Sequence, residues 1–184
     1  MTMIDTLYGP VSQDNLDRAA NIRLLVCDVD GVFSDGRIYL GNQGEELKAF
    51  HTRDGFGIKA LQGTGVQVAV ITGRRSEIVQ TRMSALGVAH IYQGVEDKVS
   101  AYEELKTTLG LEDHQCAYIG DDLVDAPVME LAGLSVAVND AHPLLLRQAH
   151  LVTGTRGGFG AVRELCDLIM EAQGTFKDAK GMSV

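Results

Sequence analysis

The stretch LLVCDVDGVFSDG, Leu24 to Gly36, ends an apolar run with two carboxylates that stand two residues apart. Side chains alternate between the faces of a strand, so Asp28 and Asp30 point the same way if the strand continues through them. Two like charges held side by side cost energy unless a cation or a shared proton relieves them. A cation-dependent site is therefore the first hypothesis, and an ordinary Asp- and Gly-containing turn is the alternative.

The composition limits the classes of protein to which this chain can belong. With 184 residues, 45% of them hydrophobic, the chain is long enough to bury a core, and we expect one domain over residues 1–184. The net charge of −9 argues against nucleic-acid binding but not against an anionic small substrate. No apolar run is long enough for a bilayer, and residues 1–15 lack the pattern of a signal peptide. Three separated cysteines in apolar contexts indicate reduced core thiols, and together these features predict a cytoplasmic protein without membrane contact.

Short apolar runs alternate with helix-like segments along the chain. We expect strands at 22–29, 66–72, 89–94, 115–121, 134–139 and 150–153. We expect helices at 55–65, 76–87, 98–110, 124–133, 142–149 and 160–174. This alternation predicts right-handed βαβ units, and hence an α/β three-layer sandwich around a mostly parallel, Rossmann-like sheet.

Polar side chains cluster just beyond the expected strands. Asp28 and Asp30 follow the first strand, Thr72 ends the second, Lys98 begins a helix, and Asp121 ends a later strand. Ligands bind beyond the carboxyl ends of the strands in open α/β sheets, so these groups converge on the binding edge. Taken singly, each has a plainer explanation: Thr72 as a strand end, and Lys98 as a solvated helix start.

The ordered set resembles the haloacid dehalogenase superfamily of phosphatases. Its four motifs stand here as DVDGV at 28–32, ITGR at 71–74, Lys98, and GDDLVD at 120–125. The resemblance implies that Asp28 is a nucleophile that forms an aspartyl-phosphate. It implies that Asp30 protonates the leaving alkoxide and then activates water. Superfamily members without an acid at this second position tend to be ATPases, so Asp30 favours a phosphatase.

The same resemblance implies a Mg²⁺ ion, which prefers oxygen ligands. Asp28, the main-chain carbonyl of Asp30, and Asp121 would hold it. Thr72 and Lys98 would hold the phosphoryl oxygens, and the lysine would also damp the repulsion among the acids. Two further acids are left open, each as a brace of the metal site or of its loop: Asp122 and Asp125.

Neither insertion point of the superfamily has room for a cap domain. Residues 32–51 alternate around the turn-forming segment 41–44 and predict a protruding β-hairpin, and residues 75–97 are filled by one helix and one strand. A capless site is open, so either the substrate is large or another subunit closes the pocket. An isolated two-stranded ribbon gains stability by pairing, which makes symmetric homo-oligomerisation a hypothesis. Residues from about 174 to 184 are expected to form a flexible tail.

From about residue 22 onward the chain resembles, more narrowly, the 3-deoxy-D-manno-octulosonate 8-phosphate phosphatases. The resemblance includes HTRDGFGIK at 51–59, TGRRSEIVQTRMSALGV at 72–88, and GGFGAVRELCDLI at 157–169. It implies a magnesium-dependent homotetramer that releases the eight-carbon sugar acid for lipopolysaccharide. The hairpins would form a central barrel and close neighbouring sites, and the tail would reach an adjacent site and help to expel product.

This anionic substrate carries a phosphate at one end and a carboxylate at the other, so it needs cations beyond Lys98. Arginine suits both groups through paired hydrogen bonds. Besides Asp30 and Lys98, the positions that match the family's substrate contacts are His51, Thr52, Arg53, Asp54, Gly55, Lys59, Arg74 and Arg82. Lys59 and Arg82 are alternatively on exposed helix faces. Asp54 is alternatively the N-cap of the following helix, or a partner of Arg53 across the loop.

Two rival functions remain open on the sequence. One is a phosphatase for a related nine-carbon, sialic-type acid phosphate, which shares the capless scaffold and most of these motifs. The other is a non-enzymatic oligomerisation module, and it predicts the loss of Asp28 or Asp30. Both acids are present.

Overall fold

A parallel sheet of six strands forms the middle layer of the protein. The structure is a computed structural model that describes residues 2–180. The strand order is β10-β9-β8-β3-β6-β7, and every pair in this sheet is parallel. The strands are β3 (Leu24–Cys27), β6 (Gln67–Thr72), β7 (His90–Gln93), β8 (Cys116–Gly120), β9 (Leu134–Ala137) and β10 (Leu151–Val152).

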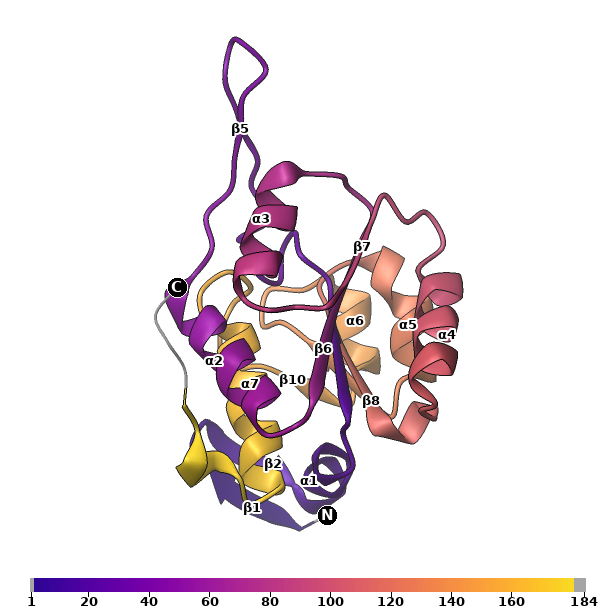
Figure 1. The fold of residues 1–184 in the computed structure, drawn as a ribbon. Helices are drawn as coiled ribbons and strands as arrows, with labels where there is room; N and C mark the ends of the chain where they lie inside the picture. Colours follow the sequence, from indigo (N-terminus) through magenta and orange to yellow (C-terminus); the bar gives the residue numbers. More distant parts are fainter. Residues whose placement is uncertain (1, 181–184) are drawn as a thin grey trace.

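Helices cover both faces of this sheet. Helices α2 (Thr52–Gly63) and α7 (Ala161–Ala172) pack together on one face, and α4 (Lys98–Leu109) and α5 (Ala126–Leu131) pack together on the other (Figure 1). The remaining helices are α1 (Gln13–Ala20), α3 (Glu77–Ala85) and α6 (Pro143–Gln148). Because both faces are covered, every residue of β3 is buried and the strand is apolar throughout. The α/β three-layer sandwich is confirmed.

The order of the strands reverses direction beside β3. From β3 the chain adds β6 and β7 on one side, and then crosses back through α4 to add β8, β9 and β10 on the other. The crevice outside the carboxyl ends of the strands at such a switch point is where ligands bind. Asp28 and Asp121 come directly after β3 and β8, so the switch point carries two of the predicted site residues.

Strand β3 ends before the first acid, so the condition that placed Asp28 and Asp30 on one strand face is not met. The chain turns at this point, because the carbonyl oxygen of Val29 accepts hydrogen bonds from three successive N–H groups, those of residues 32–34. Gly31 supports the turn with a φ of +89°, which disfavours other residues. Asp30 therefore leaves the sheet on a loop.

The predicted hairpin is present and projects from the body of the protein (Figure 1). Its strands β4 (Tyr39–Leu40) and β5 (Glu46–Leu47) are antiparallel and pair over two residues each. The side chains of Tyr39, Leu40 and Leu47 are exposed. No cap domain stands beside the hairpin among the described residues, in agreement with the sequence.

The N-terminal residues contain structure for which the sequence analysis made no prediction, and the C-terminal residues contain structure where it expected a flexible tail. A second hairpin, β1 (Met3–Thr6) with β2 (Gly9–Ser12), precedes α1, and Ser12 caps that helix. At the other end, part of the expected tail forms a 3-10 helix at Phe176–Asp178, and Phe176 and Ala179 pack against the core. The rest of the expected tail, from residue 181, lies outside the described residues.

Candidate active site

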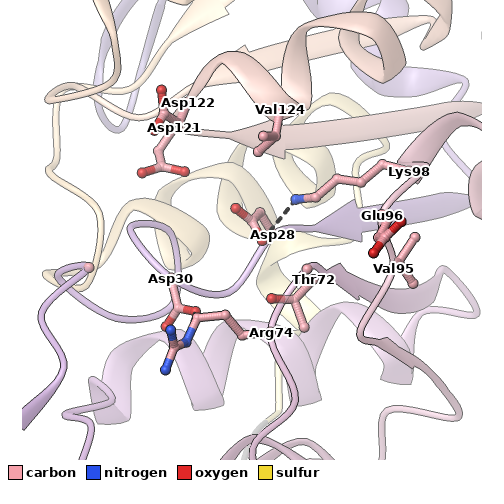
Figure 2. A pocket seen from close by; sticks show the side chains of 12 residues that line it. Asp28, Asp30, Thr72, Arg74, Val95, Glu96, Lys98, Asp121, Asp122 and Val124 are labelled. Carbon is pink, nitrogen blue, oxygen red and sulfur yellow. Dashed lines mark ion pairs between the residues drawn. The ribbon is translucent and has the colours of Figure 1, made fainter. Parts of the chain in front are cut away.

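A pocket of about 550 Å³ opens at the carboxyl ends of β3, β6 and β8 (Figure 2). Six of the predicted site residues line it: Asp28, Asp30, Thr72, Arg74, Lys98 and Asp121. Its other lining residues are Gly36, Gly73, Val95, Glu96, Asp122 and Val124. The sheet thus brings together the carboxylates, the hydroxyl and the lysine that the motif spacing predicted at one edge.

The buried carboxylate of Asp28 is paired with Lys98. The lysine Nζ lies 3.0 Å from Asp28 Oδ1, which also accepts a hydrogen bond of 2.7 Å from the N–H of Val29. Burial and the negative charge of Asp125 raise the pKa of Asp28 to about 6, and Lys98 offsets part of that rise. Lys98 is the first residue of α4, whose N-cap is Asp97, so the helix start holds its side chain over the end of β3.

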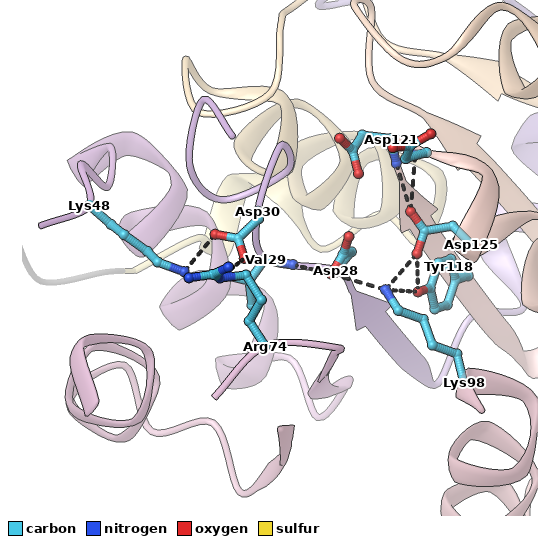
Figure 3. A network of polar contacts seen from close by, with 10 residues as sticks. Asp28, Val29, Asp30, Lys48, Arg74, Lys98, Tyr118, Asp121 and Asp125 are labelled. Atoms are coloured by element: carbon cyan, nitrogen blue, oxygen red, sulfur yellow. Dashed lines mark hydrogen bonds and ion pairs between the residues drawn. The ribbon is translucent and has the colours of Figure 1, made fainter. Parts of the chain in front are cut away.

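Asp125 braces the site, which settles a role that the sequence left open. Its side chain is fully buried, and Oδ1 accepts hydrogen bonds from Lys98 Nζ at 2.8 Å and from the Tyr118 hydroxyl at 2.7 Å (Figure 3). Oδ2 accepts from the N–H groups of Asp121 at 3.0 Å and Asp122 at 3.2 Å. One carboxylate therefore fixes both the lysine and the loop after β8.

The acids of the pocket fit a hard cation. Oxygen atoms of Asp28, Asp121 and Asp125 lie within 4.8 Å of one another. Both oxygens of Asp125 already accept hydrogen bonds from the protein, which leaves the other two carboxylates to bind a metal. Burial, followed by the charges of neighbouring acids, raises the pKa of Asp121 to about 8. A cation relieves such crowding, and oxygen ligands suit Mg²⁺.

Asp30 is held from the opposite side, by the predicted Arg74 and by Lys48, which the sequence analysis did not identify. Lys48 Nζ, from the base of the hairpin, lies 2.7 Å from Asp30 Oδ1 and 3.4 Å from Glu46 Oε1. Arg74 Nε lies 3.9 Å from Asp30 Oδ2 (Figure 3). The sequence did contain an indication of the role of Lys48. Glu46 and Lys48 alternate with Leu47, so their side chains face the same side if the extended backbone of β5 continues through Lys48.

Comparison with known proteins identifies the family. Residues 76–164 match the haloacid dehalogenase-like hydrolases. The 3-deoxy-D-manno-octulosonate 8-phosphate phosphatase of Yersinia pestis is 61% identical over 181 residues, which cover 98% of this chain and 97% of that protein. This chain belongs to that phosphatase family. It is an enzyme, a phosphoric monoester hydrolase.

Solved structures of the phosphatase family share its fold. A structure of the Yersinia pestis enzyme aligns with a TM-score of 0.98 at 60% identity, covering 100% of this chain and 99% of that one. The Moraxella catarrhalis enzyme, in complex with a magnesium ion, a phosphate ion and a KDO molecule, aligns with a TM-score of 0.88 at 42% identity, covering 90% of this chain and 95% of that one.

The other predicted substrate contacts of this phosphatase do not line the pocket of the described chain: His51, Thr52, Arg53, Asp54, Gly55, Lys59 and Arg82. All of them except His51 lie on α2 or α3. His51 is the N-cap of α2, and its Nδ1 accepts a hydrogen bond from the N–H of Arg53. Arg82 is half-buried rather than on an exposed face, and its guanidinium packs beside Gly55.

Both alternatives for Asp54 are wrong, because this acid lies inside the first turn of α2. It is neither the N-cap nor a partner of the exposed Arg53. Asp54 is buried against α7, where Oδ1 accepts a hydrogen bond of 2.9 Å from the N–H of Arg163. Its place between two helices argues against contact with substrate.

Proposed function

We propose that this phosphatase hydrolyses 3-deoxy-D-manno-octulosonate 8-phosphate to the free sugar acid and inorganic phosphate, a step of lipopolysaccharide biosynthesis. The observation that carries the proposal is the position of Asp28. Its carboxylate lines the pocket 3.0 Å from Lys98 Nζ, with the carboxylate of Asp121 beside it. A buried carboxylate that is ion-paired with a lysine at the switch point of the sheet is suited to attack an anionic phosphate ester.

In the first step, a carboxylate oxygen of Asp28 attacks the phosphorus, and the bond between phosphorus and the C8 oxygen of the sugar breaks. That oxygen takes the proton of Asp30, so the products are aspartyl-phosphate, an ionised Asp30 and the free sugar acid. In the second step, water attacks the phosphorus and gives a proton to Asp30, and the bond to Asp28 breaks. Inorganic phosphate leaves, and both acids return to their starting forms.

Three pocket residues position the reacting groups. Lys98 keeps the Asp28 carboxylate in place and offers its charge to the phosphoryl oxygens, as the Thr72 hydroxyl at the end of β6 offers a hydrogen bond. Arg74, whose side chain is 50% exposed, reaches the pocket beside Asp30 and is suited to bind the substrate carboxylate. Asp121, which lines the pocket, and the buried Asp125 behind it take no part in the transfer of the proton.

Asp28, Asp121 and the main-chain carbonyl of Asp30 are the ligands that we propose for Mg²⁺. When bound, the ion offsets the charge of the transferred phosphoryl group. Burial and neighbouring acids raise the pKa values of Asp28 and Asp121, and a cation between the two carboxylates would relieve this crowding of negative charge and favour their ionised forms.

The open pocket supports a homotetramer of single-domain chains. The hairpin exposes Tyr39, Leu40 and Leu47, and such an apolar ribbon gains by pairing with copies of itself. The predicted substrate contacts at the start of α2, between His51 and Gly55, would then bind substrate together with residues of a neighbouring chain. Light scattering of the purified protein checks this: four chains per particle is the expected mass, and a monomer at micromolar concentration contradicts it.

We also propose that the enzyme works in the cytoplasm. None of the helices in residues 2–180 is long and apolar enough to cross a membrane. Cys27, Cys116 and Cys166 are buried free thiols, which is the usual state of cysteine in that reducing compartment.

The substrate is tested by measuring phosphate release with and without Mg²⁺ from a panel of sugar phosphates. The panel holds the eight-carbon and nine-carbon keto-acid phosphates, with hexose phosphates as controls. Selective, EDTA-sensitive hydrolysis of the eight-carbon ester is expected. A preference for the nine-carbon ester keeps the chemistry and changes the pathway, and release from none of them contradicts the proposed function.

A further inference from the structure

Lys48 has a buried side chain although the residue as a whole is partly exposed. Its side chain is 0% exposed although it comes from the base of the protruding hairpin, and its ammonium group lies 2.7 Å from Asp30 Oδ1. Lysine is strongly hydrated and is rarely buried without a partner. The contact is therefore a built feature of the site rather than a surface ion pair of small effect.

The geometry leaves the two oxygen atoms of Asp30 in different situations. Oδ1 is held by Lys48, whereas Oδ2 lies 3.9 Å from Arg74 Nε, beyond hydrogen-bonding distance. Asp30 remains 19% exposed and lines the pocket. One oxygen is thus fixed and the other is left for exchange of a proton with a ligand.

Glu46 completes the arrangement. Its two oxygens lie 3.4 Å from Lys48 Nζ and 3.8 Å from Arg74 Nη2, so two acids alternate with two bases and their charges balance. Both residues beside Asp30 are therefore also ion-paired with Glu46. The base of the hairpin therefore sets the orientation of a side chain that belongs to the loop after β3.

We propose that Lys48 is a positioning residue for proton transfer by Asp30 to the leaving oxygen of the substrate. This inference rests on the role of Asp30 in the proposed function. When the bond between phosphorus and the ester oxygen breaks, the proton moves from Asp30 to that oxygen, and the ammonium group of Lys48 holds the resulting carboxylate in place for the later transfer from water.

The test compares leaving groups, because only a poor one needs the proton. A sugar alkoxide is a poor leaving group, whereas p-nitrophenolate and acetate are stable anions. In rapid-quench experiments with the full-length Mg²⁺-loaded enzyme, release of the leaving group in the first turnover is measured for the eight-carbon sugar-acid phosphate, p-nitrophenyl phosphate and acetyl phosphate. Lys48→Met is expected to slow release of the sugar by about 10- to 100-fold and release of the stable anions by about threefold or less.

Conservative and matched variants separate this role from a structural one. Lys48→Arg keeps the charge and is expected to recover most of the loss. Lys106→Met removes another lysine between two acids, at 2.7 Å from Asp113 and 3.0 Å from Glu103 and about two turns along α4 from Lys98, and should leave all three rates near those of the parent. Activity toward acetyl phosphate reports an intact fold, and Lys48→Gln replaces the methionine variant if that variant does not fold.

The outcomes distinguish this inference from the function on which it rests. Equal slowing of all three substrates by the Lys48 variants overturns the inference, as does a raised KM for the sugar ester at unchanged kcat. Asp30→Asn, measured in parallel, is expected to slow sugar release far more than acetate release. If it does so while Lys48→Met does not, Lys48 has no positioning role and the proposed function stands. If Asp30→Asn shows no such dependence, the acid role of Asp30 fails.

Discussion

Lys98 Nζ lies 3.0 Å from Asp28 Oδ1 and 2.8 Å from Asp125 Oδ1, so one buried cation serves two buried acids. Burial, followed by the charge of Asp125, still raises the pKa of Asp28 to about 6. With oxygen atoms of Asp28, Asp121 and Asp125 within 4.8 Å of one another, three acids share this one lysine, and such an arrangement favours the binding of a metal cation.

Replacing the nucleophile is expected to remove turnover and keep the fold. Asp28→Asn retains the size of the side chain and removes a buried charge, so its melting temperature in EDTA at pH 8 should equal or exceed that of the parent. Phosphate release should fall by at least about 1,000-fold. Activity within tenfold of the parent shows that another group attacks the phosphorus.

Removing the brace is expected to cost stability as well as activity. Asp125→Ala leaves the Lys98 ammonium and two backbone N–H groups without their buried acceptor, and we expect a loss of about 3–5 kcal/mol in the free energy of unfolding. Tyr118→Phe deletes one hydrogen bond to the same carboxylate and should cost about 1 kcal/mol. Urea unfolding of the metal-free proteins measures both, and equal values for the two variants contradict the ranking.

Two glycines in one loop are expected to respond differently to alanine. A Cβ on Gly157 would lie 2.7 Å from the carbonyl carbon of Gly31, whereas a Cβ on Gly154 would lie 3.7 Å from Glu164 Oε1, an ordinary contact. Gly157→Ala should therefore push the loop that carries Asp30 and cost about 1–3 kcal/mol. Gly154→Ala should stay within about 0.5 kcal/mol of the parent, and a Gly157 variant as stable and active as this control contradicts the close packing.

The buried Asp54 is expected to make stability depend on pH. Burial is the main reason that its pKa rises from the ordinary 3.8 to about 7, and Oδ2 is buried without a hydrogen-bond partner among residues 2–180. Between these values the folded state keeps a proton that the unfolded chain releases, so the free energy of unfolding falls as pH rises from about 4 through 7. The parent should lose about 2 kcal/mol relative to Asp54→Asn between pH 5 and 8.

Asp97, the N-cap of α4, has a pKa that is shifted in the opposite direction, and its variant serves as the control for that measurement. Hydrogen bonds from the hydroxyl and the N–H of Ser100 lower the pKa of Asp97, so its contribution is present above the ordinary pKa and is lost as the pH falls. Urea midpoints across the same pH range compare the parent with Asp54→Asn and Asp97→Asn, and the difference between the parent and Asp97→Asn should stay constant there, because the Asp97 contribution is lost only below the ordinary pKa of 3.8. A difference between the parent and Asp54→Asn that does not change with pH contradicts a protonated Asp54.

The strand and helix pattern predicted the fold because a sheet covered on both faces forces continuous apolar strands. The motif spacing predicted Asp28, Thr72, Lys98 and Asp121 at one edge because parallel strands end together. Lys48 could not be found in this way, since it reaches the pocket through the path of a hairpin rather than from a strand end.

Asp54 illustrates a second limit of the sequence. Its neighbours at 51–55 match a substrate-contacting motif, but its side chain turns toward α7, and only tertiary packing decides that direction. The end of β3 is a third case: the expected strand runs to Val29, whereas the observed strand ends at Cys27, and the turn that follows depends on three hydrogen bonds to one carbonyl group.

The most direct test of the account is to trap the phosphoryl group on the chain. The enzyme is mixed with the eight-carbon substrate and Mg²⁺, quenched in acid within the first turnover, reduced with borohydride, and digested for mass spectrometry. The account predicts that Asp28, and no other carboxylate, is converted to the reduced homoserine product, and that Asp28→Asn gives none. Conversion at a different residue would contradict Asp28 as the nucleophile.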